Sequence, residues 1–359
     1  MSGDRKPEDD YIFGQRRRLL YIFLFLLIAI AVAVYSFGVG SAVIDFDIAI
    51  EVIINRLNGI IPDRSEDYWA WLKDMLVIED TMPRALGGLA IGAILGICGA
   101  VMQSCVRNPL ASPYTTGISA AALFGVTISL VLGFRFIPIQ GEFGLIINAF
   151  VMAMVPSLIM IIISIRRKTT PTMLILIGIG VMYLFNAFTM IMKYRAEPDI
   201  LKQIQLWSIG SLTGISWTAV WVLGITLVAL LFFMMFYSKK LDVVSSGENQ
   251  SISLGVRPDR VRIVCMVIIS ACTAVAVAFS GAIGFVGLII PHLSRLFVGA
   301  KTNMLIPCSA VLGALLLITS DVVARLLSNG LPVGAVTALI GSPIFIYFLI
   351  RIRSNGWGR

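Results

Sequence analysis

The residue types most unusual for a membrane helix, and most able to take part in chemistry, occur together in one short stretch, GAIGFVGLIIPHLSR, at positions 281–295. A lipid-facing helix gains nothing from a proline or a histidine, whereas glycines let helices approach closely or break where neighbouring protein satisfies the freed amides. The stretch is therefore expected to be short and buried in protein. A lone histidine without other ligands is expected to be structural and not to bind a metal. The residues concerned are Gly284, Gly287, Pro291, His292 and Arg295.

Composition restricts the class of protein. The 359 residues are 58% hydrophobic and 13% charged, with a mean hydropathy of +0.93, which predicts an all-α polytopic membrane protein. The five cysteines lie in apolar runs without a C-x-x-C pair and are interpreted as small hydrophobic residues. The net charge of +8 is explained by basic cytoplasmic loops, so no nucleic-acid partner is expected.

Apolar runs predict ten transmembrane helices. The first follows a polar tail, 1–18, whose length and mixed charge favour an uncleaved span over a signal peptide. The run at 286–298 is too short to cross alone and is expected to be a partial helix packed among the others. The predicted spans are 19–39, 84–105, 114–133, 143–165, 172–192, 215–237, 263–284, 286–298, 304–327 and 333–350.

Charge predicts the orientation of the chain. Most Lys and Arg residues fall in segments predicted to lie on the opposite side of the membrane from the acidic segment 40–82. Both termini are therefore expected in the cytoplasm, and the membrane is expected to be a plasma or inner membrane. Residues 19–352 then form one membrane domain between the cytoplasmic tails 1–18 and 353–359. The longest cytoplasmic loop is predicted at 239–262.

A second glycine-rich stretch, 92–125, contains a chain break at R-N-P and a later glycine. Together with 281–295 it resembles two signatures of the permease subunits of ABC importers for iron-siderophores, haem and cobalamin. These are G-F-V-G-L-I-x-P-H-x-x-R and a longer pattern containing Q-x-x-x-R-N-P-L-A-x-P-x-x-x-G. The matching residues of the second stretch are Gln103, Asn108, Pro109, Pro113 and Gly117.

The resemblance implies a fold, a function and partners. The fold is that of a type II ABC importer permease with ten helices per protomer. The partners are a second copy of the chain, two ATP-binding subunits, an extracytoplasmic substrate-binding protein and membrane lipid. No cofactor is expected on this chain, and ATP with Mg²⁺ is expected on the partner ATPase, since the chain has no G-x-x-x-x-G-K-[ST] motif. The chain itself is then not an enzyme. Ferric siderophore is the first cargo expected, with haem, cobalamin and molybdate as alternatives.

The resemblance also assigns two arginines to docking of the binding protein. Arg84 follows Met82 and Pro83, where the family has R-L-P-R, and Arg325 stands near the end of the ninth span. Alternatively, Arg325 merely pairs with Asp321 one turn away. Two departures from the family pattern alter the expected docking chemistry: Thr81 replaces an arginine and Gly330 replaces a glutamate.

A further segment resembles the coupling helix through which such permeases contact the ATPase. It lies in the loop 239–262 and comprises Ser251, Leu254, Gly255 and Val256. The alternative is an ordinary solvated basic loop.

The translocation pathway implied by the resemblance lies between two copies, along the fifth and tenth spans. The alternative for these methionine and aromatic residues is packing. The lining candidates are Met182, Tyr183, Asn186, Met190, Thr337, Ser342 and Tyr347.

Two other classes of function stay open. A self-contained secondary transporter or channel would need no ATPase, but proton- and sodium-coupled carriers usually need ionisable groups inside the membrane. Asp321 is the nearest to such a group. An intramembrane enzyme is the more distant alternative, since no Ser/His or metal-ligand cluster supports hydrolysis.

Overall fold

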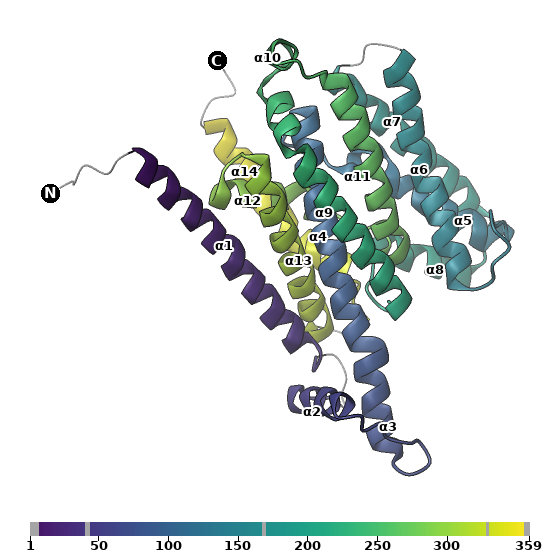
Figure 1. The fold of residues 1–359 in the computed structure, drawn as a ribbon. Coiled ribbons are helices and arrows are strands. Elements are labelled where there is room, and N and C mark those ends of the chain that lie inside the picture. Colours follow the sequence, from purple (N-terminus) through teal and green to yellow (C-terminus); the bar gives the residue numbers. More distant parts are fainter. Residues whose placement is uncertain (1–6, 40–43, 167–169, 328–329, 355–359) are drawn as a thin grey trace.

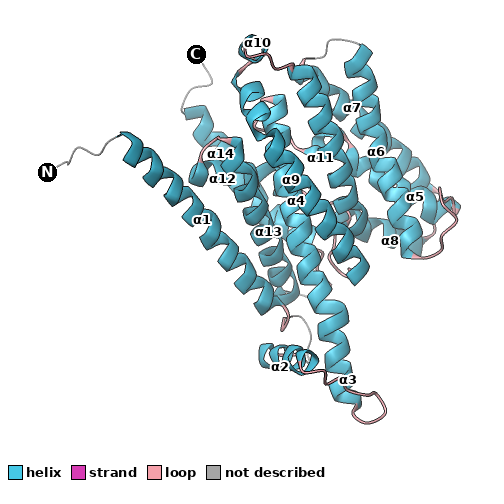
Figure 2. Ribbon diagram, viewed as in Figure 1, coloured by secondary structure: helices cyan, strands magenta, loops and turns pink. Residues whose placement is uncertain are grey.

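The protein is a bundle of long helices packed side by side (Figure 1). The computed structural model describes residues 7–39, 44–166, 170–327 and 330–354, and helices dominate this part (Figure 2). Residues 1–6 and 355–359 of the predicted tails, and 40–43 of the predicted acidic segment, lie outside the described residues.

The longer helices follow the apolar runs of the sequence, and shorter ones lie between them. The helices are α1 (Pro7–Ser36), α2 (Phe46–Leu57), α3 (Tyr68–Met75), α4 (Met82–Val106), α5 (Ile118–Leu132), α6 (Glu142–Arg166), α7 (Pro171–Tyr194), α8 (Pro198–Ile209), α9 (Trp217–Ser246), α10 (Glu248–Ser253), α11 (Pro258–Ser280), α12 (Val286–Val298), α13 (Thr302–Leu327) and α14 (Val333–Ser354).

Each predicted span overlaps one of these helices. Among the described residues, seven helical stretches are long and apolar enough to cross a membrane, and three shorter apolar ones correspond to α5, α12 and α14. The short span predicted at 286–298 matches α12. α5 begins later than predicted, because Pro113–Thr116 form a 3-10 turn and Gly117 then adopts a left-handed conformation with φ 87°.

The two ends of the bundle differ. α10, the start of α1 and the end of α14 lie at one end, which we call the α10 end, and α2 and α3 lie at the other, the α2 end (Figure 1). The loop predicted at 239–262 is much shorter in the structure, because α9 continues to Ser246 and α11 starts at Pro258. Leu241 and Val244 keep the apolar spacing of α9 and are fully buried, which explains the extension.

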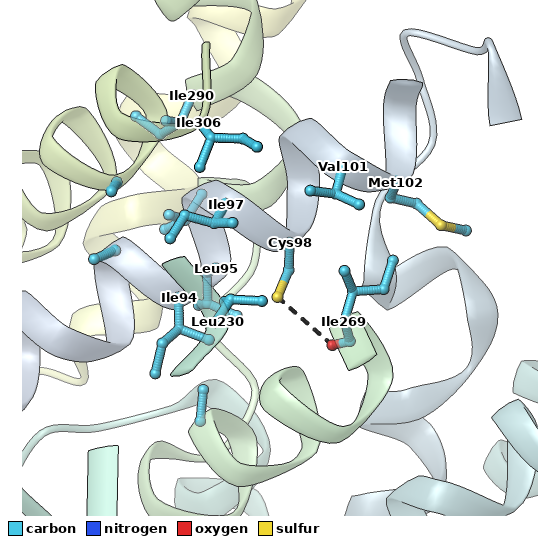
Figure 3. Close-up of a cluster of buried hydrophobic side chains, with 14 of the residues drawn as sticks. Ile94, Leu95, Ile97, Cys98, Val101, Met102, Leu230, Ile269, Ile290 and Ile306 are labelled. Atoms are coloured by element: carbon cyan, nitrogen blue, oxygen red, sulfur yellow. Dashed lines mark hydrogen bonds between the residues drawn. The ribbon is translucent and has the colours of Figure 1, made fainter. Parts of the chain in front are cut away.

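α4 is the central helix, and most of its surface is buried. Its glycines bring backbones into contact: a Cβ added to Gly92 would lie 2.3 Å from the Gly313 carbonyl oxygen on α13, and one added to Gly96 would lie 2.2 Å from that of Ser309. The other faces of α4 pack Ile94, Leu95 and Ile97 among apolar side chains of α9, α11, α12 and α13 (Figure 3). These close backbone contacts explain why glycine occupies both positions.

At the α2 end, α4 continues without a break into α3 through a π-helical segment, Leu76–Thr81. The Trp217 indole Nε1 at the start of α9 donates a hydrogen bond of 2.9 Å to the Ile78 carbonyl oxygen of this segment. α9 is thereby fixed to the extension that carries α3.

Candidate functional site

The two glycine-rich stretches of the sequence form one internal structure. Gln103 on α4 is buried, and its Nε2 donates to the Leu288 carbonyl oxygen of α12 at 3.1 Å. Its Oε1 accepts a hydrogen bond of 2.6 Å from Arg295 Nη1, which also lies on α12. The amide therefore uses both of its polar ends to hold α12 against α4.

A glycine pair explains how α12 comes so close to α4. A Cβ on Gly99 would lie 1.9 Å from the Gly287 carbonyl oxygen, so only glycine fits there. Pro291 has no N–H to offer to that carbonyl four residues earlier, which leaves it free of the usual helical bond. His292 lies on the same helix, half-buried, with Nδ1 3.1 Å from the Leu288 carbonyl oxygen. The imidazole is therefore engaged within its own helix.

The chain break after α4 is a compact turn that touches two other helices. The Asn108 side chain accepts a hydrogen bond from the Leu110 amide at 2.9 Å. Pro109 has no N–H with which to continue α4, and Pro113 begins the short 3-10 turn that precedes α5. The Tyr114 hydroxyl accepts a hydrogen bond of 3.1 Å from the Ile283 amide. Gly284, next to Ile283, has open space where a side chain would be. The turn thus supports the irregular segment that precedes α12.

The same turn packs on α7. A Cβ on Gly178 would lie 2.8 Å from both the Thr115 carbonyl oxygen and the Thr116 Cα, and one on Gly117 would lie 3.1 Å from the Met182 amide nitrogen. The contact is backbone against backbone. A movement at the end of α4 would therefore reach α7 directly.

A buried ion cluster lies near the α2 end. Asp321 on α13 is fully buried and accepts hydrogen bonds from Arg84 on α4, through Nη2 at 2.7 Å and Nε at 3.0 Å. Arg325, one turn further along α13, forms an ion pair with Asp321 at 2.9 Å. One carboxylate therefore serves two arginines, and the pairing considered for Arg325 is present.

The cluster also holds neighbouring elements. Arg325 Nη1 donates to the carbonyl oxygens of Ser36 and Val39 at the end of α1, at 2.9 and 2.6 Å. Arg84 Nη1 lies 3.4 Å from the Thr213 hydroxyl oxygen, just before α9. Only 7% of Arg84 and 6% of Arg325 is exposed. Internal acceptors therefore use both guanidinium groups, and a role of Arg84 and Arg325 in docking a binding protein stays a prediction. Thr81 is buried as well, and Gly330 is exposed.

α10 presents apolar side chains at the opposite end of the molecule. Ile252 is 63% exposed and Leu254 is 68% exposed. Gly255 ends the segment with φ 75°, a conformation that favours glycine, and Val256 is half-buried. Ser251, which the resemblance assigns to the same segment, is fully buried and donates to the Val243 carbonyl oxygen of α9 at 2.9 Å. Ser251 therefore anchors α10 and does not contribute to its exposed face.

Arg262 is a second anchor at this end. Its side chain on α11 is 4% exposed, Nε donates to the Cys105 carbonyl oxygen of α4 at 3.2 Å, and Nη1 lies 3.5 Å from Glu248 Oε1 of α10. A third contact, of 3.5 Å, reaches Asp259. One guanidinium group thus joins α4, α10 and α11.

The pathway candidates divide by exposure. On α7, Tyr183, Asn186 and Met190 are exposed and Met182 is half-buried. On α14, Tyr347 is exposed and Ser342 is half-buried, with its hydroxyl bonded to the Ala338 carbonyl oxygen. Thr337 is fully buried and donates to the Gly334 carbonyl oxygen at 3.0 Å, so it does not line a surface of the protomer.

Several residues that organise these regions were missed at the level of sequence. Tyr114 and Arg262 each form a hydrogen bond to a residue far away in the sequence, which no local pattern reveals. Ile252 lies between two predicted coupling residues and is an apolar side chain in a polar loop, a signal that was available. Among the described residues, no group of three or more His, Cys, Asp or Glu side chains is placed to hold a metal ion.

Fold and site together define a multi-pass helical membrane protein. Its two glycine-rich stretches pack tightly against each other, and exposed apolar side chains lie at the α10 end. The FecCD transport family matches residues 20–351, so the chain belongs to this family. Its members are ABC transporter permeases, the translocation subunits, which are not catalytic. The resemblance of the two glycine-rich stretches is thereby confirmed.

Individual relatives agree with this assignment. The iron(3+)-hydroxamate import system permease protein FhuB of Bacillus subtilis is 36% identical over 282 residues, which is 77% of this chain and 72% of that protein. The vitamin B12 import system permease protein BtuC of Vibrio cholerae is 34% identical over 286 residues, which is 79% of this chain and 85% of that protein. A metal-chelate type ABC transporter solved in an inward-facing conformation is 29% identical, with a TM-score of 0.78 over 92% of this chain and 99% of that chain.

Proposed function

We propose that this chain is the membrane permease of an ATP-driven importer for a metal chelate, with ferric siderophore as the first cargo to test. Haem, cobalamin and molybdate are the alternatives. The single observation that carries the proposal is the match of residues 20–351 to the FecCD transport family. Relatives named for hydroxamate siderophore and vitamin B12 import support the range of cargo.

The pathway is proposed to lie between two copies of the chain. Each protomer would contribute ten membrane helices, and the three short ones, α5, α12 and α14, would be completed by their neighbours. The exposed faces of α7 and α14 would meet their counterparts across a two-fold axis. Tyr183, Met190 and Tyr347 would then face a bulky, partly apolar cargo.

The two ends are proposed to serve different partners. The α10 end would face the cytoplasm, with both chain termini, and Ile252, Leu254, Gly255 and Val256 would contact the two ATP-binding subunits, which hold ATP and Mg²⁺. The substrate-binding protein would dock at the α2 end. Arg84 and Arg325 would serve docking indirectly, by fixing the ends of α1, α4 and α13 around Asp321.

A secondary transporter is less well supported. Such carriers usually depend on an intramembrane group that exchanges a proton or ion. Asp321, the carboxylate that best fits this role in the sequence, is fully buried and paired with two arginines. This carboxylate is therefore already engaged in joining α4 and α13.

Purification of the tagged protein from its native membrane in mild detergent tests the proposal. Partners and their stoichiometry would be identified by mass spectrometry. An ATPase with a Walker motif, recovered in a one-to-one ratio with this chain, is the expected result. Recovery of this chain alone, active in proteoliposomes without ATP, would overturn the proposal in favour of a secondary transporter.

A further inference from the structure

Arg262 is a buried cation that three different elements share. Its side chain is 4% exposed, although it lies in the second turn of α11, near the α10 end. A buried guanidinium group needs acceptors for its donors, since leaving them unpaired is costly. Its acceptors come from α4, α10 and its own helix. The position of each element therefore affects the energy of the same side chain.

The contact with α4 is a helix cap. Cys105 is the penultimate residue of α4, so its carbonyl oxygen lacks a partner within the helix. Arg262 Nε donates to this oxygen at 3.2 Å. The positive charge also lies at the negative end of the α4 dipole, where cations are favourable. The end of α4 is thus tied to the α11 side chain.

The contact with α10 is of another kind. Glu248 is the first residue of α10, its side chain is 53% exposed, and it lies 3.5 Å from Arg262 Nη1. This longer, half-solvated pair can stretch or shorten at little cost. The hydroxyl of Ser251 holds the other side of α10 to α9. α10 is therefore hinged on α9 and linked to α4 through Arg262.

The turn that follows α4 connects this helix to α7. Arg107 ends α4 in a left-handed conformation, with φ 53°, and the Asn108–Gly117 turn follows. This turn packs backbone to backbone on Gly178 of α7. A displacement of the α4 end would reach a helix whose exposed face carries Tyr183 and Met190.

We propose that Arg262 is the positioning residue through which movement of α10 reaches α4 and, through the Asn108–Gly117 turn, α7. The inference rests on the proposed function, because it assigns one side chain to the transmission of ATPase closure. Arg262 itself touches neither cargo nor nucleotide. Its loss is expected to separate ATP hydrolysis from transport and to leave both partner contacts in place.

The test uses the permease assembled with its ATP-binding subunits and its binding protein in proteoliposomes. ATP hydrolysis and cargo uptake are measured on the same vesicles for wild type, Arg262→Gln, Glu248→Gln and the control Arg260→Gln, which alters an exposed arginine two residues away. For Arg262→Gln, uptake per ATP hydrolysed is expected to fall about tenfold, the effect of losing a charge-assisted hydrogen bond. Arg260→Gln is expected to leave this ratio unchanged.

Glu248→Gln keeps the exposed end of α10 and the cap on α4, so it tests the link even if Arg262→Gln does not assemble. It is expected to lower uptake per ATP, and adding it to Arg262→Gln should cause no further loss. An unchanged ratio in either assembled variant would overturn the inference, as would a parallel fall of hydrolysis and uptake. Absence of ATP-dependent uptake by the wild type would instead overturn the proposed function.

Discussion

Two arginine-centred clusters lie at opposite ends of α4, and they are built differently. At the α2 end, Arg84 and Arg325 share the fully buried Asp321 at 2.7 and 2.9 Å. At the α10 end, Arg262 meets Glu248 and Asp259 at 3.5 Å, and both carboxylates are largely exposed. The first cluster is closed and leaves little freedom for movement. The second is half open to solvent, which suits a contact that must move.

The largest expected effect is on the closed cluster. Asp321→Ala would leave two guanidinium groups buried without their carboxylate, and removing one partner of a buried ion pair costs about 3–5 kcal/mol. The thermal stability of the purified protein in detergent is expected to fall sharply. Asp259→Ala, at the exposed carboxylate of the other cluster, is the matched control and should change stability little. Equal stability of the two variants would contradict the difference between the clusters.

Arg84→Gln should have a smaller effect on the same cluster. Asp321 would keep Arg325 as its partner, so the loss is that of one charge-assisted hydrogen-bonding group, about 1.5–3 kcal/mol. Lower thermal stability is expected. Affinity for the binding protein is expected to fall only because the helix ends are less well fixed. Unchanged stability with lost affinity would show instead that Arg84 contacts the binding protein directly.

A matched pair of variants distinguishes the exposed Leu254, which directly follows α10, from the buried Ser251 within α10. Leu254→Asp should abolish recovery of the ATPase with the permease and change stability by less than about 0.5 kcal/mol, because the side chain is exposed. Ser251→Ala should lower stability by about 1 kcal/mol, the value of a buried hydrogen bond, and retain the ATPase. Co-purification and thermal melting measure both. The reverse pattern would mean that α10 contacts its partner through the other face.

A small stability effect is also expected for Glu248→Gln. The pair with Arg262 is long and half-solvated, and such pairs contribute at most about 1 kcal/mol. The melting temperature should stay close to that of the wild type in low and high salt. A loss of stability as large as that of Arg84→Gln would mean that the cluster at the α10 end is as closed as the other one.

Much of the fold was predictable because apolar runs and glycine spacing are local properties of the sequence. The bounds of α12 were expected from such patterns, whereas the identity of α13 as the helix that packs against the glycines of α4 was not. The extension of α9 to Ser246 was not expected, because Lys239 and Lys240 suggested a loop, whereas the burial of Leu241 comes from tertiary packing.

The sequence identified several residues of the candidate site, but it did not reveal which contacts they make. The sequence singled out Arg84, Arg325 and Ser251, and all three proved to be buried with internal partners. A family motif marks positions, but burial depends on what packs over them. The bond between Arg262 and Cys105 joins residues 157 positions apart, and no local pattern could have revealed it.

The central claim is that ATP hydrolysis by a partner drives import through this chain. The most direct test measures uptake of a ferric siderophore into proteoliposomes that contain the permease and its ATP-binding subunits. The binding protein is supplied on the membrane face opposite to the ATP-binding subunits. Uptake that requires ATP and persists after ion gradients are dissipated is the predicted result. Uptake that needs no ATPase and stops when the gradients are dissipated would contradict the account.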